Sequence, residues 1–214
     1  MTYIRKHIKV VLFDHDDTLV ATRRAKWAMH KHIAGNYYNK HLTEDELRLH
    51  WGKPLSKMLS LLYGTADIAT ALEHAHANST DFPKILHDDT LSTLALIKNS
   101  GKKIGVITAT TRPNLMYDFK TMRFPSNLFD YTQTEEDTAY HKPDPRVFEP
   151  TLNWLKQNKV KTSEVIYVGD GLHDMKAALG AGFDFIGVST GLITQSEFIK
   201  HGVKAINRLS DLHN

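Results

Sequence analysis

Val10-Val11-Leu12-Phe13-Asp14-His15-Asp16-Asp17-Thr18-Leu19, near the start of the chain, is the stretch that decides the fold. Its four apolar residues indicate a strand buried on both faces, as in a parallel sheet. The carboxylates that follow at Asp14, Asp16 and Asp17 would repel one another unless a positive charge lay among them, which indicates a metal site. Aspartate and threonine also favour turns and helix N-caps, so an acidic capping turn is the alternative at this point.

The composition is typical of a soluble globular protein with a sizeable core. The chain has 214 residues, of which 41% are hydrophobic and 24% charged. It contains no cysteine, which excludes disulfides, thiolate metal sites and cysteine catalysis and favours the cytoplasm. It also shows no membrane-spanning run and no signal-peptide pattern. The net charge of +3 includes no basic block, so we expect neither a nucleic acid nor a membrane as partner.

Strands and helices alternate towards the two ends of the chain, a pattern typical of βαβ units with a parallel sheet. Expected strands are 10–13, 103–108, 129–132, 165–168 and 185–188, with a shorter candidate at 205–206. Expected helices are 91–97, 114–122, 147–157 and 174–179. We therefore predict an α/β fold with a Rossmann-like parallel sheet and helices on both faces.

The segment 21–83 interrupts this alternation, because its apolar residues recur at helical spacing and it contains no convincing strand. Thr43 and Glu46 have the spacing of a capping box, and Thr65 is a candidate helix N-cap. We predict a core domain of residues 1–20 and 84–214 with an inserted all-helical cap domain of residues 21–83.

Polar residues follow the predicted strands at the edge where ligands bind in an open parallel sheet. The first strand is followed by an acidic turn, the second by hydroxyl groups and a later one by a glycine and two further carboxylates, and a lysine opens the helix at 147. These residues are Asp14, Asp16 and Thr18; Thr108 and Ala109; Gly169, Asp170 and Asp174; and Lys142. Their convergence on one edge favours the metal site over the capping turn.

In this order the motifs resemble those of the haloacid dehalogenase-like hydrolase superfamily. Asp14-x-Asp16-x-Thr18 matches its first motif, Thr108 its second, Lys142-Pro143 its third and Gly169-Asp170-x-x-x-Asp174 its fourth. The resemblance covers the whole core, whereas the insert resembles the cap of the phosphoglycolate phosphatase-like branch only in position and helical type.

The resemblance implies a role for each matching residue. Asp14 would be the nucleophile that forms an aspartyl-phosphate, and Asp16 the general acid and then base. Mg²⁺ would be held by Asp14, Asp170 and the backbone carbonyl of Asp16. Phosphoryl oxygens would be bound by Lys142 and by Thr108 with Ala109. Asp174 would orient Lys142 or metal-bound water, and Thr18 would shape the turn.

Two residues depart from the family pattern, and two others are candidates for substrate contact. Asp17 stands where the family often has glycine, and we expect its side chain to point outward. His15 replaces a residue that is usually apolar. Arg23 and Lys53, in the predicted cap, could bind an anionic substrate, although a solvated turn is the alternative interpretation for Lys53.

These residues predict a Mg²⁺-dependent phosphatase that hydrolyses a small phosphorylated metabolite. A phosphotransferase or mutase of the β-phosphoglucomutase type is the alternative, since it would use the same nucleophile. A non-catalytic phosphate-binding protein would require a lost catalytic residue, and none of the motif residues is missing. We expect a monomer or a homodimer.

Overall fold

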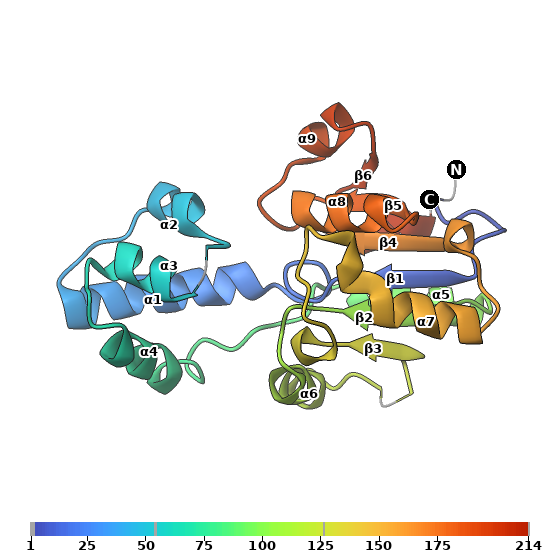
Figure 1. Cartoon of the computed structure of the whole chain (residues 1–214). Coiled ribbons are helices and arrows are strands. Elements are labelled where there is room, and N and C mark those ends of the chain that lie inside the picture. The colour runs from blue at the N-terminus through green and yellow to red at the C-terminus, as the bar shows by residue number, and fades with distance from the viewer. Residues whose placement is uncertain (1–2, 54, 126, 214) are drawn as a thin grey trace. The chain divides into compact units, whose positions relative to one another are not determined.

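The computed structural model describes residues 3–53, 55–125 and 127–213 and separates into two compact units (Figure 1). Unit 1 consists of Met1–Ala21 and Leu86–Asn214, and unit 2 of Thr22–Ile85. Among the described residues, no helix combines the length and the apolar character needed to cross a bilayer.

Unit 1 is built on a parallel sheet, which in the described part of the chain has six strands in the order β3-β2-β1-β4-β5-β6 (Figure 1). The strands are β1 (Val10–Phe13), β2 (Lys103–Ile107), β3 (Tyr131–Gln133), β4 (Val165–Gly169), β5 (Asp184–Val188) and β6 (Lys204–Ile206). In the register of the sheet, Phe13 lies opposite Val106 of β2 and Val168 of β4. The residues that follow these three strands therefore meet at one edge.

Each face of the sheet has its own hydrophobic core, because successive side chains of a strand point to opposite faces. Val11 and Phe13 belong to one core, and Val10 and Leu12 to the other. Helices α5 (Thr90–Asn99) and α6 (Arg112–Thr121) pack on the first. Helices α7 (Glu149–Gln157), α8 (Leu172–Gly180) and α9 (Gln195–Lys200) pack on the second. Four short 3₁₀ segments complete the described part of unit 1: η1 (Glu135–Asp137), η2 (Pro145–Phe148), η3 (Thr162–Glu164) and η4 (Leu209–His213).

Unit 2 contains the helices α1 (Thr22–Tyr38), α2 (Glu44–His50), α3 (Leu55–Tyr63) and α4 (Ile68–Ala77). The predicted capping box opens α2, where Thr43 and Glu46 exchange hydrogen bonds. The predicted N-cap at Thr65 is wrong, because Asp67 accepts the backbone N–H of Thr70 and caps α4 instead. The Thr65 hydroxyl accepts the backbone N–H of Asp67 and so orders the turn before the helix.

The predicted fold class is confirmed, with shifts at two elements. The strand expected at 129–132 is β3, two residues later at its start, because Phe129 packs into the core of the first face instead of extending the sheet. The helix expected at 147–157 divides into η2 and α7. These shifts leave the predicted site residues at the carboxyl ends of their strands.

Candidate active site

The end of β1 places Asp14 between the ends of its two neighbouring strands. The backbone N–H of Asp14 donates to the carbonyl of Val168 on β4, and the residue is buried. The chain then turns tightly, because Leu19 and Val20 both donate their N–H groups to the carbonyl of His15. This turn fixes the direction of the side chains between Asp14 and Val20.

Asp17 does not point outward as expected, because it is buried with 7% of its surface exposed. Its φ of 57° lies in the left-handed region that favours glycine, which explains why glycine is common there in the family. The negative charge of Asp17 contributes to the raised pKa of Asp170. Asp17 is therefore part of the electrostatic environment of the site.

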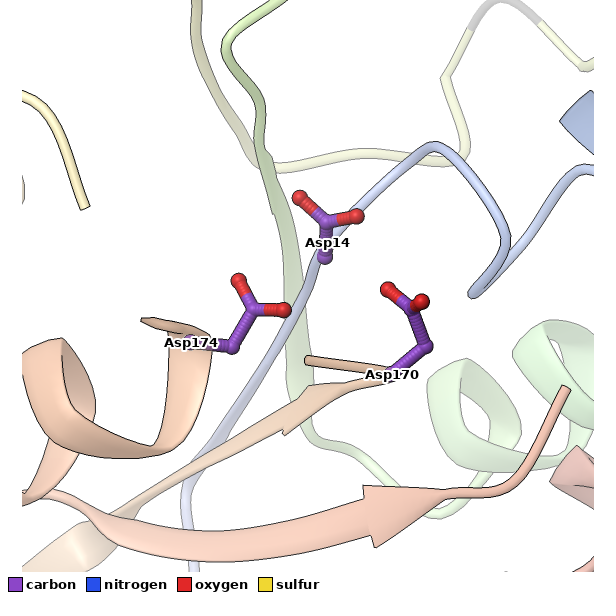
Figure 2. A group of neighbouring side chains, drawn as sticks. All are labelled: Asp14, Asp170 and Asp174. Carbon is purple, nitrogen blue, oxygen red and sulfur yellow. The ribbon is translucent and has the colours of Figure 1, made fainter. Parts of the chain in front are cut away.

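Three carboxyl groups meet at the edge of the sheet (Figure 2). Asp14 follows β1, Asp170 follows β4 and Asp174 lies in the first turn of α8, and oxygen atoms of all three lie within 4.8 Å of one another. Gly169 makes this approach possible, because a Cβ atom there would lie 2.7 Å from the Asp174 side chain.

Lys142 brings the positive charge that this acidic group requires. Its Nζ atom lies 2.6 Å from an oxygen of Asp14 and 2.7 Å from an oxygen of Asp174. The contact with Asp14 is a hydrogen bond, whereas the contact with Asp174 is an ion pair without hydrogen-bond alignment. All three side chains are at least nine-tenths buried, so their charges interact with little screening by water.

Burial and mutual repulsion shift the pKa values of these groups. Burial raises the pKa of Asp14 to about 6, although the Lys142 ammonium opposes the shift. Burial, together with the charges of Asp174 and Asp14, raises the pKa of Asp170 well above its usual range. Burial alone would lower the pKa of Lys142, but Asp14 and Asp174 outweigh it and raise that pKa well above normal. Lys142 is therefore charged at neutral pH.

The acidic group fits a magnesium ion. Mg²⁺ prefers carboxylate oxygens together with water and phosphate oxygens, and carboxylates at this spacing could share one ion. Burial and the repulsion between the carboxylates raise the pKa values of Asp14 and Asp170, and a bound cation would offset both effects. Thr18 supports this part of the site, since its buried hydroxyl donates to Asp170 over 3.5 Å.

The end of β2 adds hydroxyl groups to the same edge. The backbone N–H of Thr108 donates to Gln133 of β3, and the neighbouring Ala109 is exposed. A small hollow beside Thr108 and Lys142 is also lined by Ala109 and by residues that follow β3. The carboxylate of Asp16 accepts a hydrogen bond of 2.7 Å from the hydroxyl of Thr110. The structure thus brings the predicted residues of the core motifs together in unit 1.

Comparison with known proteins decides the family. The sequence model of the haloacid dehalogenase-like hydrolase family matches residues 11–188 of this chain, which include every motif described above. The chain belongs to the haloacid dehalogenase-like hydrolase family. It is therefore an enzyme of a hydrolase family, as its motifs predicted.

Relatives within this hydrolase family align with nearly the whole chain. Pyrophosphatase PpaX of Bacillus pumilus is 25% identical over 208 residues, which cover 96% of this chain and 94% of the relative. Pyrophosphatase PpaX of Bacillus velezensis is 27% identical over 186 residues, which cover 86% of this chain and 84% of that relative. The structure of a HAD-superfamily hydrolase of subfamily IA from Geobacter sulfurreducens has the same fold, with a TM-score of 0.74 and 19% identity. The match covers 96% of this chain and 95% of that chain.

Tyr167 and Gly191 also contribute to this site, and neither was identified from the sequence. The hydroxyl of Tyr167, buried on β4, accepts a 2.7 Å hydrogen bond from Lys142 and donates to the carbonyl of Ile107. Gly191 follows β5, and a Cβ atom there would lie 1.8 Å from an oxygen of Asp170. A polar residue within an apolar strand could have indicated Tyr167, whereas nothing in the sequence distinguishes Gly191.

The two candidates for substrate contact in unit 2 have local partners. The guanidinium of Arg23 lies over the ring of Trp27, 5.2 Å from its centre. The ammonium of Lys53 donates to the carbonyl of Leu49 and lies 3.3 Å from Nδ1 of His50, at the C-terminal end of α2. A role for either residue in substrate binding stays a prediction.

Proposed function

We propose that the protein is a Mg²⁺-dependent phosphatase that hydrolyses a small phosphorylated metabolite through an aspartyl-phosphate on Asp14. The observation that carries this proposal is the contact of Lys142 with both Asp14 and Asp174, beside the second metal-binding candidate Asp170. A nucleophilic carboxylate, a fixed cation and a set of ion-binding oxygens are the groups that phosphoryl transfer requires.

In the first step, a carboxylate oxygen of Asp14 attacks the phosphorus atom. The new bond forms as the bond to the leaving oxygen breaks, and Asp16 gives its proton to that oxygen so that an alcohol departs. Lys142 and the Thr108 hydroxyl bind the phosphoryl oxygens, on which negative charge accumulates. Mg²⁺, held by Asp14, Asp170 and the Asp16 carbonyl, would supply positive charge that lets two anions approach.

In the second step, water attacks the phosphorus atom of the aspartyl-phosphate. Asp16, now ionised, takes a proton from this water, and the bond between phosphorus and Asp14 breaks with its electron pair returning to the carboxylate. Inorganic phosphate leaves, and both aspartates regain their starting protonation. Asp174 keeps Lys142 in place throughout, because its carboxylate lies 2.7 Å from the ammonium.

The names of the relatives supply the first substrate to test. Because two relatives are called pyrophosphatases, inorganic pyrophosphate belongs in a panel with small phosphate monoesters. A mutase of the β-phosphoglucomutase type would use the same nucleophile, so products from sugar 1-phosphates must be identified. We place the reaction in the cytoplasm, with the protein as a monomer or homodimer, since the lack of cysteine fits a reducing compartment.

The test is phosphate release by the full chain, with added Mg²⁺ or with EDTA. We expect Mg²⁺-dependent hydrolysis of p-nitrophenyl phosphate that falls by at least about a thousandfold in Asp14→Asn, because the nucleophile is lost. Asp45→Asn, which removes an exposed carboxylate on α2, is the matched control and should keep full activity. Undiminished hydrolysis by Asp14→Asn would contradict the proposal, and isomerised sugar phosphate without phosphate release would indicate the mutase.

A further inference from the structure

We propose that Thr110 is a positioning residue that holds Asp16 for proton transfer. The hydroxyl of Thr110 donates to Oδ2 of Asp16 over 2.7 Å, and both residues are only partly exposed. This inference rests on the proposed function, in which Asp16 moves the proton, and it assigns a role to a residue outside the four family motifs.

The backbone of Thr110 is fixed well enough for this role. Its N–H donates to the Thr108 hydroxyl oxygen over 3.0 Å, and its carbonyl accepts the N–H of Glu135 over 3.3 Å. Thr108 is itself held by the carbonyl of Gln133. The Thr110 hydroxyl therefore projects from a turn that is tied to the ends of two strands.

The same turn arranges two catalytic functions. Because the Thr108 oxygen accepts the N–H of Thr110, its own proton is directed to another acceptor, which in the proposed reaction is a phosphoryl oxygen. The Thr110 hydroxyl meanwhile fixes the orientation of the Asp16 carboxyl group. The tripeptide Thr108-Ala109-Thr110 thus sets the distance between phosphate binding and proton transfer.

The hydrogen bond also selects the oxygen of Asp16 that carries the proton. A hydroxyl that donates to Oδ2 favours protonation at Oδ1, since two hydrogen atoms at one oxygen would repel each other. A carboxyl group held in one orientation loses less entropy when it transfers its proton to the leaving oxygen. The benefit increases with the basicity of that oxygen, because a basic leaving group cannot depart without a proton.

This dependence on the leaving group provides the test. Phenyl phosphate and p-nitrophenyl phosphate have similar shapes, but phenolate is much more basic than p-nitrophenolate. We expect Thr110→Val to lower kcat/KM for phenyl phosphate by roughly tenfold, within the range of general acid catalysis, and for p-nitrophenyl phosphate by less than about twofold. Thr110→Ser keeps the hydroxyl and should restore the parent ratio of the two values.

Thr111→Val is the matched control, because it makes the same substitution one residue later at a hydroxyl that forms no capping hydrogen bond to α6. It should leave both substrates unaffected. Asp16→Asn should show the same selective loss as Thr110→Val or a larger one, and the double variant should lose no more than Asp16→Asn alone. The Mg²⁺ affinity of Thr110→Val, measured by calorimetry, should be unchanged.

Equal losses for both substrates, no loss, or a Thr110→Ser variant as impaired as Thr110→Val would each overturn the role of Thr110. A weakened Mg²⁺ affinity would overturn it as well, because the effect would then be structural. These results are distinguishable from failure of the proposed function, which would show as activity retained by Asp14→Asn.

Discussion

Lys142 is the residue on which the electrostatics of the site depend. A buried ammonium is costly unless it is paired, and here it contacts the carboxyl groups of Asp14 and Asp174 and the hydroxyl of Tyr167. Removal of Lys142 would leave the buried carboxylates of Asp14 and Asp174 close together without its ammonium between them. This arrangement explains why one lysine can both fix the nucleophile and remain charged for phosphate binding.

Asp17 acts against the charge compensation that Lys142 provides, because it adds a buried negative charge near Asp170. We expect Asp17→Asn to raise the free energy of unfolding of the metal-free protein by about 1 kcal/mol, since it removes repulsion and asparagine tolerates a positive φ. The same variant should bind Mg²⁺ several-fold more weakly, because the site loses negative charge.

Urea unfolding in EDTA and Mg²⁺ calorimetry measure the two effects of Asp17→Asn. Asp17→Gly is the comparison that also changes the backbone preference at the φ of 57°. Lower stability together with unchanged Mg²⁺ affinity in Asp17→Asn would show that the charge of Asp17 does not act on the site.

At the scale of elements, the connection from β2 into α6 holds the acidic turn that follows β1. Thr110 at the start of this connection contacts Asp16, and Asp118 within α6 lies 3.0 Å from Nε2 of the buried His15. The histidine that replaces the usual apolar residue at position 15 therefore has a polar partner on the neighbouring helix. Two successive side chains of the turn, His15 and Asp16, thus contact one neighbouring segment.

In unit 2, His30 on α1 makes stability depend on pH. Its Nδ1 atom is 2.7 Å from the hydroxyl of Tyr63 on α3, and burial followed by the charge of Lys26 lowers its pKa to about 4. The unfolded chain binds this proton near pH 6.5, whereas the folded chain does not. Stability is therefore complete above pH 6.5 and is lost as the pH falls towards 4, by up to about 3 kcal/mol.

Urea unfolding followed by tryptophan fluorescence measures this effect of His30. In a Trp154→Phe background the signal comes from Trp27 and Trp51, both in unit 2. We expect the loss of stability between pH 7 and pH 5 to be clearly smaller in His30→Gln, and unchanged in the control His41→Gln, which alters an exposed histidine. Equal losses in all three proteins would exclude His30 as the cause.

At the scale of the whole molecule, the buried carboxyl groups of the site lower the stability of the metal-free protein. Asp14 has a pKa of about 6 in the fold against an ordinary value of 3.8, so the folded state retains a proton that the unfolded chain releases. The stability of the metal-free protein therefore falls as the pH rises from about 4 through 6, by up to about 3 kcal/mol from this group. Bound Mg²⁺ should reverse the loss, since it favours the ionised form.

The free energy of unfolding of the parent chain relative to Asp14→Asn measures this contribution. In EDTA, the parent should become less stable relative to the variant as the pH rises from 4.5 to 7. With saturating Mg²⁺ at pH 7, the parent should regain stability and the variant much less, because it lacks one ion-binding carboxylate. A difference that is independent of both pH and Mg²⁺ would contradict the assignment of Asp14.

Local sequence determines the elements and the chemistry that each carries. Apolar runs such as 10–13 form strands, and parallel strands place the residues after them at one edge, so the approach of Asp14, Asp170 and Lys142 could be predicted. The direction of an individual side chain could not be predicted, because it depends on register and on turn geometry. Asp17 is buried in a turn where its own φ is positive, and the contact of Thr110 with Asp16 joins segments 94 residues apart. The space that Gly191 leaves for Asp170 exists only once β4 and β5 are paired.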